Sequence, residues 1–268
     1  MATSEDEKEP PPDYDLGTHE PLSRTSSQSA ASISTLTATH SFHPARSFFI
    51  HAHGIGWLRI PGPSTETSIP VTDEATGKTV YTSIRKSKWA SEWELKNEAS
   101  KVLGRVNGDR FSNIVLREIQ MELIGKGGGI EAVKMKRKAL MTRTCVFEYG
   151  GWIWIWRYGR QEEGAGMNGH TLLVCERRGR GVAGGEGLGQ SVKVAQLVRD
   201  KEMDEKGGVK STAAGRGGRL DISEGVTEGG EVMEVLVVIS CLVMLKKEMD
   251  RRRNTTGAAL SPPGSALS

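Results

Sequence analysis

Lysines at alternating positions are the first feature of this sequence whose spacing suggests a chemistry. The run KMKRK carries them at the first, third and fifth positions of residues 134–138. In a β-strand the three ammonium groups share one face, opposite Met135 and Arg137. Each could add about 1 kcal/mol to the binding of anionic phospholipid, although edge lysines also protect a solvated strand from aggregation. With two later arginines, the lipid-binding candidates are Lys134, Lys136, Arg137, Lys138, Arg177 and Arg178.

A proline-rich tetrapeptide near the start is a second candidate site. PPDY, with Pro11, Pro12 and Tyr14, matches the PPxY ligand of WW domains. The prolines pre-form an extended left-handed helix and the tyrosine fills an aromatic groove, so docking loses little entropy. A WW-domain protein, for example a ubiquitin ligase, is therefore a candidate partner. A chance match within a proline-rich segment is the alternative.

The histidines and glycines do not form a recognisable metal or nucleotide site. His51 and His53 share a strand face, but no carboxylate or thiolate lies beside them, which favours an ordinary half-exposed strand. The runs GKGGG, GVAGGEGLGQ and RGGR lack the spacing or the strand–loop–helix order of nucleotide sites, and a single RGGR is not an RNA-binding array. We interpret all three as loops, and we expect no metal, no cofactor and no nucleic-acid partner.

No arrangement of nucleophile and base indicates catalysis. Cys145, Cys175 and Cys241 are three thiols in apolar surroundings without metal-ligand spacing, which is typical of a reducing compartment. Five of the six histidines precede residue 54. We expect a protein that is not an enzyme; a triad assembled from residues distant in the sequence is the alternative.

Charge is unevenly distributed along the chain. Residues 1–46 hold seven acidic and three basic side chains, a net charge of −4, so the rest carries +7 within the chain's net +3. Residues 1–45 are rich in Pro, Ser and Thr and poor in large apolar groups, which predicts a disordered tail. The acidic start, MATSEDEKEP, matches neither a secretory signal nor a mitochondrial transit peptide. We expect a cytoplasmic protein whose basic part meets anionic partners, including membrane surfaces.

Short runs rich in β-branched and aromatic residues fill much of residues 46–253. Separated by Gly, Asn and Asp clusters, they predict an antiparallel all-β sandwich or barrel. The clearest is WIWIWRY, residues 152–158, which places three tryptophans on one face and should be a central strand. IGKGGGIE, residues 124–131, is expected to be a hairpin loop, and residues 201–218 a long polar loop. The remaining runs are SFFIHA, GWLRI, TVYTSI, KWASEWEL, SNIVLREIQ, ALMTRTCVFEY, HTLLVCER and VKVAQLV.

The most apolar segment, VMEVLVVISCLVML at residues 232–245, could cross a membrane or lie inside a domain. Fourteen helical residues span roughly 21 Å, against about 30 Å of hydrocarbon. A helix over about residues 231–250 would be apolar on almost every side between Val235 and Leu245, and such a helix must be surrounded by protein. We therefore favour a core helix over a tail anchor, an interfacial helix or a strand, and we expect residues 254–268 to be a disordered tail.

In the order and character of these segments the chain resembles the tubby C-terminal-like superfamily, which includes tubby proteins, plant LURP-one-related proteins and phospholipid scramblases. The matching segments, over about residues 47–253, are TVYTSI followed by KWASEWEL, then FEYGGWIWIWRY, LLVCE, VKVAQLV and VMEVLVVISCLVML. The resemblance, nearest to small fungal members, implies a closed antiparallel barrel of about twelve strands around a hydrophobic C-terminal helix. The chain lacks a Lys/Arg pair equivalent to the tubby phosphoinositide site, and also the acidic calcium segment and membrane span of scramblases, so neither activity is implied.

Three functions from different classes follow, together with one alternative that concerns the membrane. The leading hypothesis is a non-enzymatic, monomeric binding module that associates peripherally with anionic phospholipid through a basic barrel face. The second is a protein-interaction adaptor that recruits WW-domain proteins through PPDY without binding lipid; a protein anchored in the membrane through residues 232–245 is a further alternative. The third is an enzyme that uses the barrel end, which an open polar cavity beside the central helix would favour.

Overall fold

Twelve strands and two helices make up the described part of the chain. The computed structural model describes residues 42–54, 66–87, 90, 92–107, 118–125, 127–138, 142–159, 171–179, 191–199 and 215–260, with side chains as far as Arg251. The chain divides into two units, Met1–Thr39 and His40–Ser268, and every described residue belongs to the second. The elements are β1 (Pro44–His53), β2 (Ser68–Asp73), β3 (Thr79–Ile84), β4 (Trp93–Asn97), β5 (Val102–Asn107), β6 (Ile119–Ile124), β7 (Ile130–Arg137), β8 (Cys145–Tyr149), β9 (Trp152–Tyr158), β10 (Thr171–Gly179), β11 (Val192–Arg199), β12 (Arg216–Ser223), α1 (Glu224–Thr227) and α2 (Glu231–Leu260).

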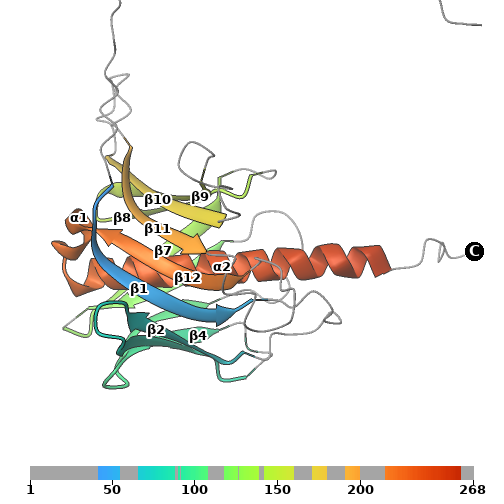
Figure 1. Cartoon of the computed structure of the whole chain (residues 1–268), viewed down its shortest axis with the longest axis horizontal. Helices are drawn as coiled ribbons and strands as arrows, with labels where there is room; N and C mark the ends of the chain where they lie inside the picture. Colours follow the sequence, from blue (N-terminus) through green and yellow to red (C-terminus); the bar gives the residue numbers. More distant parts are fainter. Residues whose placement is uncertain are drawn as a thin grey trace, which may run out of the picture. The chain divides into compact units, whose positions relative to one another are not determined.

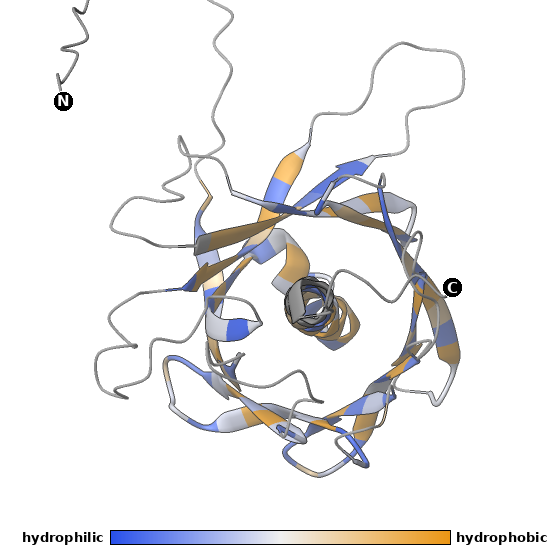
Figure 2. Ribbon diagram, turned by 90° about the vertical axis from the view of Figure 1, so that its right-hand side faces the viewer, coloured by the Kyte–Doolittle hydropathy of each residue, from blue (hydrophilic) through white to orange (hydrophobic). Residues whose placement is uncertain are grey.

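The strands form one closed antiparallel barrel, as predicted. Each strand pairs with its neighbours in the chain, and β1 closes the ring by pairing with both β2 and β12. Phe48, for example, lies opposite Asp73 on one side and Leu220 on the other. Figure 2 looks along the barrel and shows the strands surrounding α2. Closure leaves no unpaired edge strand, so the apolar sheet presents no open edge to another chain.

Side chains alternate between the interior and the outer face along each strand. In β9, Trp154 and Trp156 are fully buried inside the barrel, and Phe147 of β8 stacks on Trp154 with ring centroids 5.8 Å apart. The prediction of a central strand with three tryptophans on one face is therefore confirmed. Trp152, at the start of the strand, is 38% exposed because it lies at the barrel end.

Helix α2 fills the barrel, which confirms the predicted surrounded helix. Every residue from 234 to 245 is buried, and Figure 1 shows α2 running through the strands and continuing beyond them. At mid-helix Trp156 Nε1 donates to Ser240 Oγ at 2.9 Å, and this hydroxyl donates to the Val237 carbonyl at 3.1 Å. These two hydrogen bonds satisfy the polar groups of Trp156 and Ser240 inside an apolar interior.

The described helices include none that is both long and apolar enough to cross a membrane.

The prediction that RGGR is a loop is wrong. Residues 216–219 begin β12, between β1 and β11. A side chain at Gly217 would have its Cβ 1.8 Å from the Ile50 carbonyl oxygen, and one at Gly218 would lie 2.3 Å from that of Val198. The glycines therefore mark close approach of neighbouring strands, a use of Gly that composition alone does not separate from a loop.

The central helix is longer than predicted, and it ends at Leu260 rather than near residue 250. Residues 254–260, expected to belong to a disordered tail, are therefore helical. The sequence offers a reason, because no proline occurs between the start of α2 and Pro262. The residue before a proline disfavours the helical conformation, so the helix can continue until just before Ser261.

The other predicted loops and strands agree with the structure in part. The predicted hairpin at IGKGGGIE is the β6–β7 connection, with Gly125 N donating to the Gly129 carbonyl at 2.9 Å. The runs predicted as strands do not include β2 or β5, and the run SNIVLREIQ contributes its last residues to β6. GWLRI lies outside the described residues.

Candidate functional site

The predicted lysine face exists on the outside of β7. Val133 and Met135 are buried in the barrel, whereas Lys134, Lys136 and Lys138 are exposed. The alternation therefore confirms that the three lysines share one face. Lys134 is 64% exposed and its Nζ lies 3.8 Å from Glu118, a weak surface pair.

The structure does not bring Arg177 to this face. Arg177 pairs with Trp154 across the β9–β10 ladder and lies on the inward side. Its guanidinium lies 4.5 Å from the Trp152 ring centroid and 5.8 Å from that of Trp154. Arg178 follows on the outward side, beside Ile153, but two strands of the ladder separate it from β7. Of the predicted lipid candidates, the β7 residues are the ones that lie together.

Two further cations join the β7 residues at the barrel end where α2 leaves. Arg137 pairs with Cys145 in the ladder, and Lys247 Nζ lies 3.5 Å from Cys145 Sγ. Arg143 is exposed, with its guanidinium 5.2 Å from the Tyr158 ring centroid. Three elements, β7, the β7–β8 connection and α2, thus place cations at this end of the barrel, with Lys136 on the outer face of β7 and Arg137 on its inner face. We call this group the basic rim: Lys136, Arg137, Lys138, Arg143 and Lys247.

The remaining sequence candidates do not form a site in the described structure. Pro11, Pro12 and Tyr14 lie outside the described residues. His51 Nε2 lies 2.9 Å from Thr72 Oγ1, and His53 donates its backbone N–H to Glu66. Among the residues described, no group of three or more His, Cys, Asp or Glu side chains could hold a metal ion.

A buried carboxylate at each end of the apolar part of α2 is held by an arginine and a tyrosine from the barrel wall. Near the start of the helix, Arg46 Nη1 donates to Glu234 at 2.8 and 3.0 Å, and the Tyr81 hydroxyl also donates to Glu234. Arg46 Nε donates in addition to Asp73 at 3.1 Å. We call Glu234, Arg46 and Tyr81 the Glu234 clamp.

The equivalent group near the other end is the Glu248 clamp: Glu248, Arg199 and Tyr158. Arg199 donates to both carboxylate oxygens, at 2.9 and 3.1 Å, and the Tyr158 hydroxyl donates to one of them. The backbone N–H of Gly215 donates to the other at 3.1 Å. Arg199 is 3% and Glu248 is 7% exposed, so this clamp is closed to solvent.

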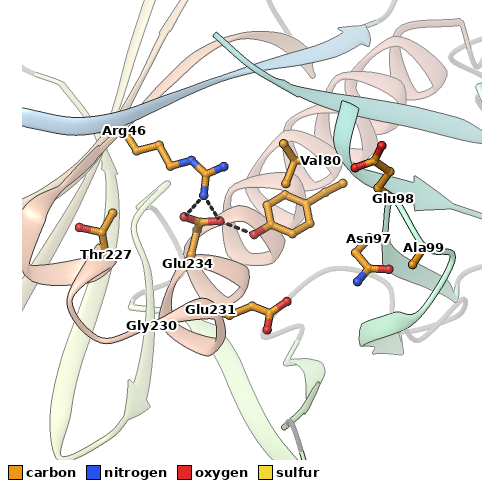
Figure 3. Close-up of a pocket in the computed structure, with 10 residues that line it drawn as sticks. Arg46, Val80, Asn97, Glu98, Ala99, Thr227, Gly230, Glu231 and Glu234 are labelled. Carbon is orange, nitrogen blue, oxygen red and sulfur yellow. Dashed lines mark hydrogen bonds and ion pairs between the residues drawn. The ribbon is translucent and has the colours of Figure 1, made fainter. Parts of the chain in front are cut away.

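The Glu234 clamp, in contrast, forms one wall of an open pocket of about 740 Å³. Figure 3 shows Arg46 reaching Glu234 from the barrel wall, with Glu231 on the same helix and Asn97 across the opening. The lining residues come from β1, β3, the end of β4 and the turn after it, α1 and the start of α2. The lining is Arg46, Val80, Tyr81, Asn97, Glu98, Ala99, Thr227, Gly230, Glu231 and Glu234.

Burial and charge together raise the pKa of the tyrosine in each clamp. Burial raises the pKa of Tyr81, and so do the hydrogen bond to Glu234 and the charge of that carboxylate. Burial likewise raises the pKa of Tyr158, together with the charge of Glu248 and the hydrogen bond to it. Both phenols therefore stay protonated and keep donating at neutral pH. Burial acts to lower the pKa of Arg46, but the charge of Glu234 and the hydrogen bonds to Asp73 and Glu234 outweigh it and raise the pKa.

Sequence reasoning did not select the six clamp residues as candidates. A signal was present, because Glu234 interrupts an apolar segment and a carboxylate buried in such a helix needs a partner. The partner itself was hidden, since Arg46 lies 188 residues away in the sequence. The pocket followed from the same long-range contact and could not be located without it.

Comparisons with models of protein families, with curated proteins and with solved structures found no match to this chain.

Proposed function

We propose that this protein is a non-enzymatic binding module that associates with anionic phospholipid surfaces through the basic rim. The observation that supports the proposal is the convergence of five cations from three elements at one end of the barrel. Lys136, Lys138 and Arg143 are exposed and can reach a headgroup without a change of fold. The other two cations lie beside them, half buried, and add to the local positive potential.

The number of exposed cations sets the free energy with which the basic rim can bind an anionic membrane. Each exposed cation near an anionic membrane contributes about 1 kcal/mol, so three give on the order of 3 kcal/mol. That corresponds to roughly a hundredfold preference for anionic over neutral vesicles. The preference must fall as salt rises, because the Debye length shortens to about 8 Å at physiological ionic strength.

Flotation with vesicles tests the proposal. The protein should float with vesicles containing phosphatidylserine at low salt, release at high salt, and not float with phosphatidylcholine alone. Replacing Lys136, Lys138 and Arg143 together by Gln should abolish flotation. Replacing Lys78, Lys96 and Lys101 by Gln removes the same charge from the other half of the barrel and should leave flotation unchanged. Equal loss in both triple variants would contradict a role for the basic rim.

The closed barrel around a central helix supports membership of the tubby C-terminal-like superfamily, and we include that membership, with a cytoplasmic location, in the proposal.

The adaptor hypothesis rests on PPDY, and the same preparation can test it. A protein that never floats but is retained by an immobilised WW domain favours the adaptor. Retention that survives Tyr14→Ala would exclude PPDY as the ligand.

A further inference from the structure

The open pocket beside the Glu234 clamp has the size and lining of a small-ligand site. Its volume of about 740 Å³ lies within the usual range of such sites, roughly 300–1,000 Å³. Val80 and Ala99 give it apolar walls, and the Asn97 amide and the Thr227 hydroxyl add polar groups. The Glu234 clamp holds one wall rigidly, because its arginine and tyrosine fix the carboxylate in a single orientation. The pocket is therefore present before any ligand arrives.

Charge decides which ligand suits the pocket. Three carboxylates line it, those of Glu98, Glu231 and Glu234, against one guanidinium, that of Arg46. Arg46 already forms ion pairs with Glu234 and Asp73, so an incoming anion would have to compete with these carboxylates for the guanidinium. The start of α2 contributes about half a positive charge, which is smaller than the net charge of −2 on the lining side chains. The pocket therefore attracts cations.

The carboxylates do not have a common structural reason to gather here. Acidic residues in the first turn of a helix complement its dipole, which accounts for Glu231 and Glu234. Glu98 has no such reason, because it lies in the β4–β5 turn and not in the helix. A lining that combines carboxylates from the helix and from the barrel wall with apolar side chains suits a ligand that carries its charge on a carbon chain.

A bare metal ion is the wrong cation for this geometry. No three carboxylates among the described residues are close enough to share one metal ion, those of the pocket included. A cation whose charge is spread over an organic body can instead meet one carboxylate at a time. Its N–H groups can donate to Glu98 and Glu231, and its methylene groups can lie on Val80 and Ala99.

The same groups favour binding over reaction. Glu234 is held by Arg46 and Tyr81, and the raised pKa of Tyr81 keeps that phenol protonated, so neither is a ready base or nucleophile at neutral pH.

We infer that this pocket binds an organic ammonium ion, either a free alkylamine or a lysine side chain of a peptide. The inference is independent of the lipid proposal, because the pocket lies at the start of α2 and the basic rim lies at the opposite end of the barrel. A protein could fail to bind vesicles and still bind an amine, and the reverse also holds.

Titration calorimetry of the full chain at about 150 mM salt tests the inference. One probe is spermidine, another is the peptide Ala-Lys-Ala-Lys-Ala, and inorganic phosphate is the anionic counter-probe. We expect saturable one-to-one binding of spermidine, of the peptide or of both, and none of phosphate. Which ammonium probe binds distinguishes a free amine from a lysine side chain.

A matched pair of double variants makes the test specific. Glu98→Gln with Glu231→Gln removes two exposed pocket charges and should weaken binding roughly fivefold to tenfold, since each exposed charge pair contributes a few-fold. Glu224→Gln with Glu228→Gln removes two exposed charges from α1 and its C-cap, at the same barrel end but outside the lining, and should change the affinity less than twofold. Absence of saturable binding by both ammonium probes would overturn the inference. Equal weakening by the two double variants, or tighter binding of phosphate, would overturn it as well.

Discussion

The two ends of the apolar part of α2 each carry a buried carboxylate, and the two carboxylates differ in how far solvent can reach the residues that hold them. Fourteen residues, about 21 Å of helix, separate Glu234 from Glu248, and each carboxylate is held by an arginine and a tyrosine from the wall. At the Glu248 clamp the arginine is 3% exposed, whereas Arg46 of the Glu234 clamp is 37% exposed and shares its charge with Asp73. One clamp is sealed, and the other borders a pocket.

The sealed clamp can anchor the helix, and the open clamp can in addition be reached by solvent and ligands. A helix that is apolar almost all round gains burial energy at many positions along the barrel axis, so direction and register must come from polar contacts. The Glu248 clamp supplies such a contact where no ligand can reach it. The Glu234 clamp supplies a second one, and the same carboxylate forms a wall that solvent and ligands can reach. One type of contact therefore anchors the helix at one end of the barrel and forms the wall of a pocket at the other.

The largest effect is expected from opening the sealed clamp. Glu248→Ala leaves Arg199 buried without its carboxylate and also removes the acceptor of Tyr158 and Gly215. Breaking a buried ion pair in this way should lower the free energy of unfolding by about 3–5 kcal/mol. Urea unfolding followed by tryptophan fluorescence measures it, because Trp154 and Trp156 are fully buried.

Two variants keep this prediction testable. Asp250→Ala, two residues further along α2, removes a partly exposed carboxylate that pairs with Lys246 and should change stability by less than about 0.5 kcal/mol. If Glu248→Ala does not fold, Glu248→Gln, which keeps the shape and an acceptor, should fold with a smaller loss. A stability of Glu248→Ala equal to that of the unaltered protein would show that the clamp does not anchor the helix.

The open clamp should matter less for stability. Glu234→Ala removes the same kind of carboxylate, but Arg46 keeps Asp73 as a partner and is partly solvated. We expect a loss of about 1–3 kcal/mol, mainly from the unpaired hydroxyl of Tyr81 and the weakened arginine contact. The measurement is the same urea titration, run beside Glu248→Ala. Equal losses at both ends would remove the distinction between a sealed and an open clamp.

The architecture was largely predictable because it depends on local patterns. The alternation in WIWIWRY and the fully apolar stretch at residues 232–245 each state which faces must be buried, and a helix with no polar side can only be enclosed. β12 shows where such reasoning fails. Its Gly217 and Gly218 look like loop residues, yet they are required by the close approach of strands whose sequence positions are far away.

The candidate site was only half predictable for the same physical reason. The lysines of β7 share a face through a local period of two, and the sequence shows that period directly. The pocket depends on Arg46 meeting Glu234 across 188 residues, and no local pattern encodes that meeting. Arg177 is a case in which a predicted site residue lies elsewhere. Arg178 lies on the outward face of β10, whereas Arg177 lies on the inward side and packs on tryptophan rings at the barrel end.

The smallest effect concerns the second partner of Arg46 and appears as a pH dependence. Burial acts to raise the pKa of Asp73, but hydrogen bonds from Thr76 and Arg46, with the charge of Arg46, outweigh it and lower the pKa. A carboxylate with a lowered folded pKa stabilises the protein fully above its unfolded pKa of about 3.9, and the contribution is lost as pH falls through the folded value.

Asp73→Asn should therefore reduce stability by on the order of 1 kcal/mol between about pH 5 and 7, and the difference from the unaltered protein should shrink below about pH 4. Urea midpoints measured across that range give the difference directly, and acid effects elsewhere in the molecule cancel in it. Glu74→Gln, on the exposed neighbouring turn residue, should show no such pH-dependent difference. A difference for Asp73→Asn that stays constant down to pH 3 would mean that the charge of Asp73 does not support Arg46. The open clamp would then depend on the pairing of Arg46 with Glu234.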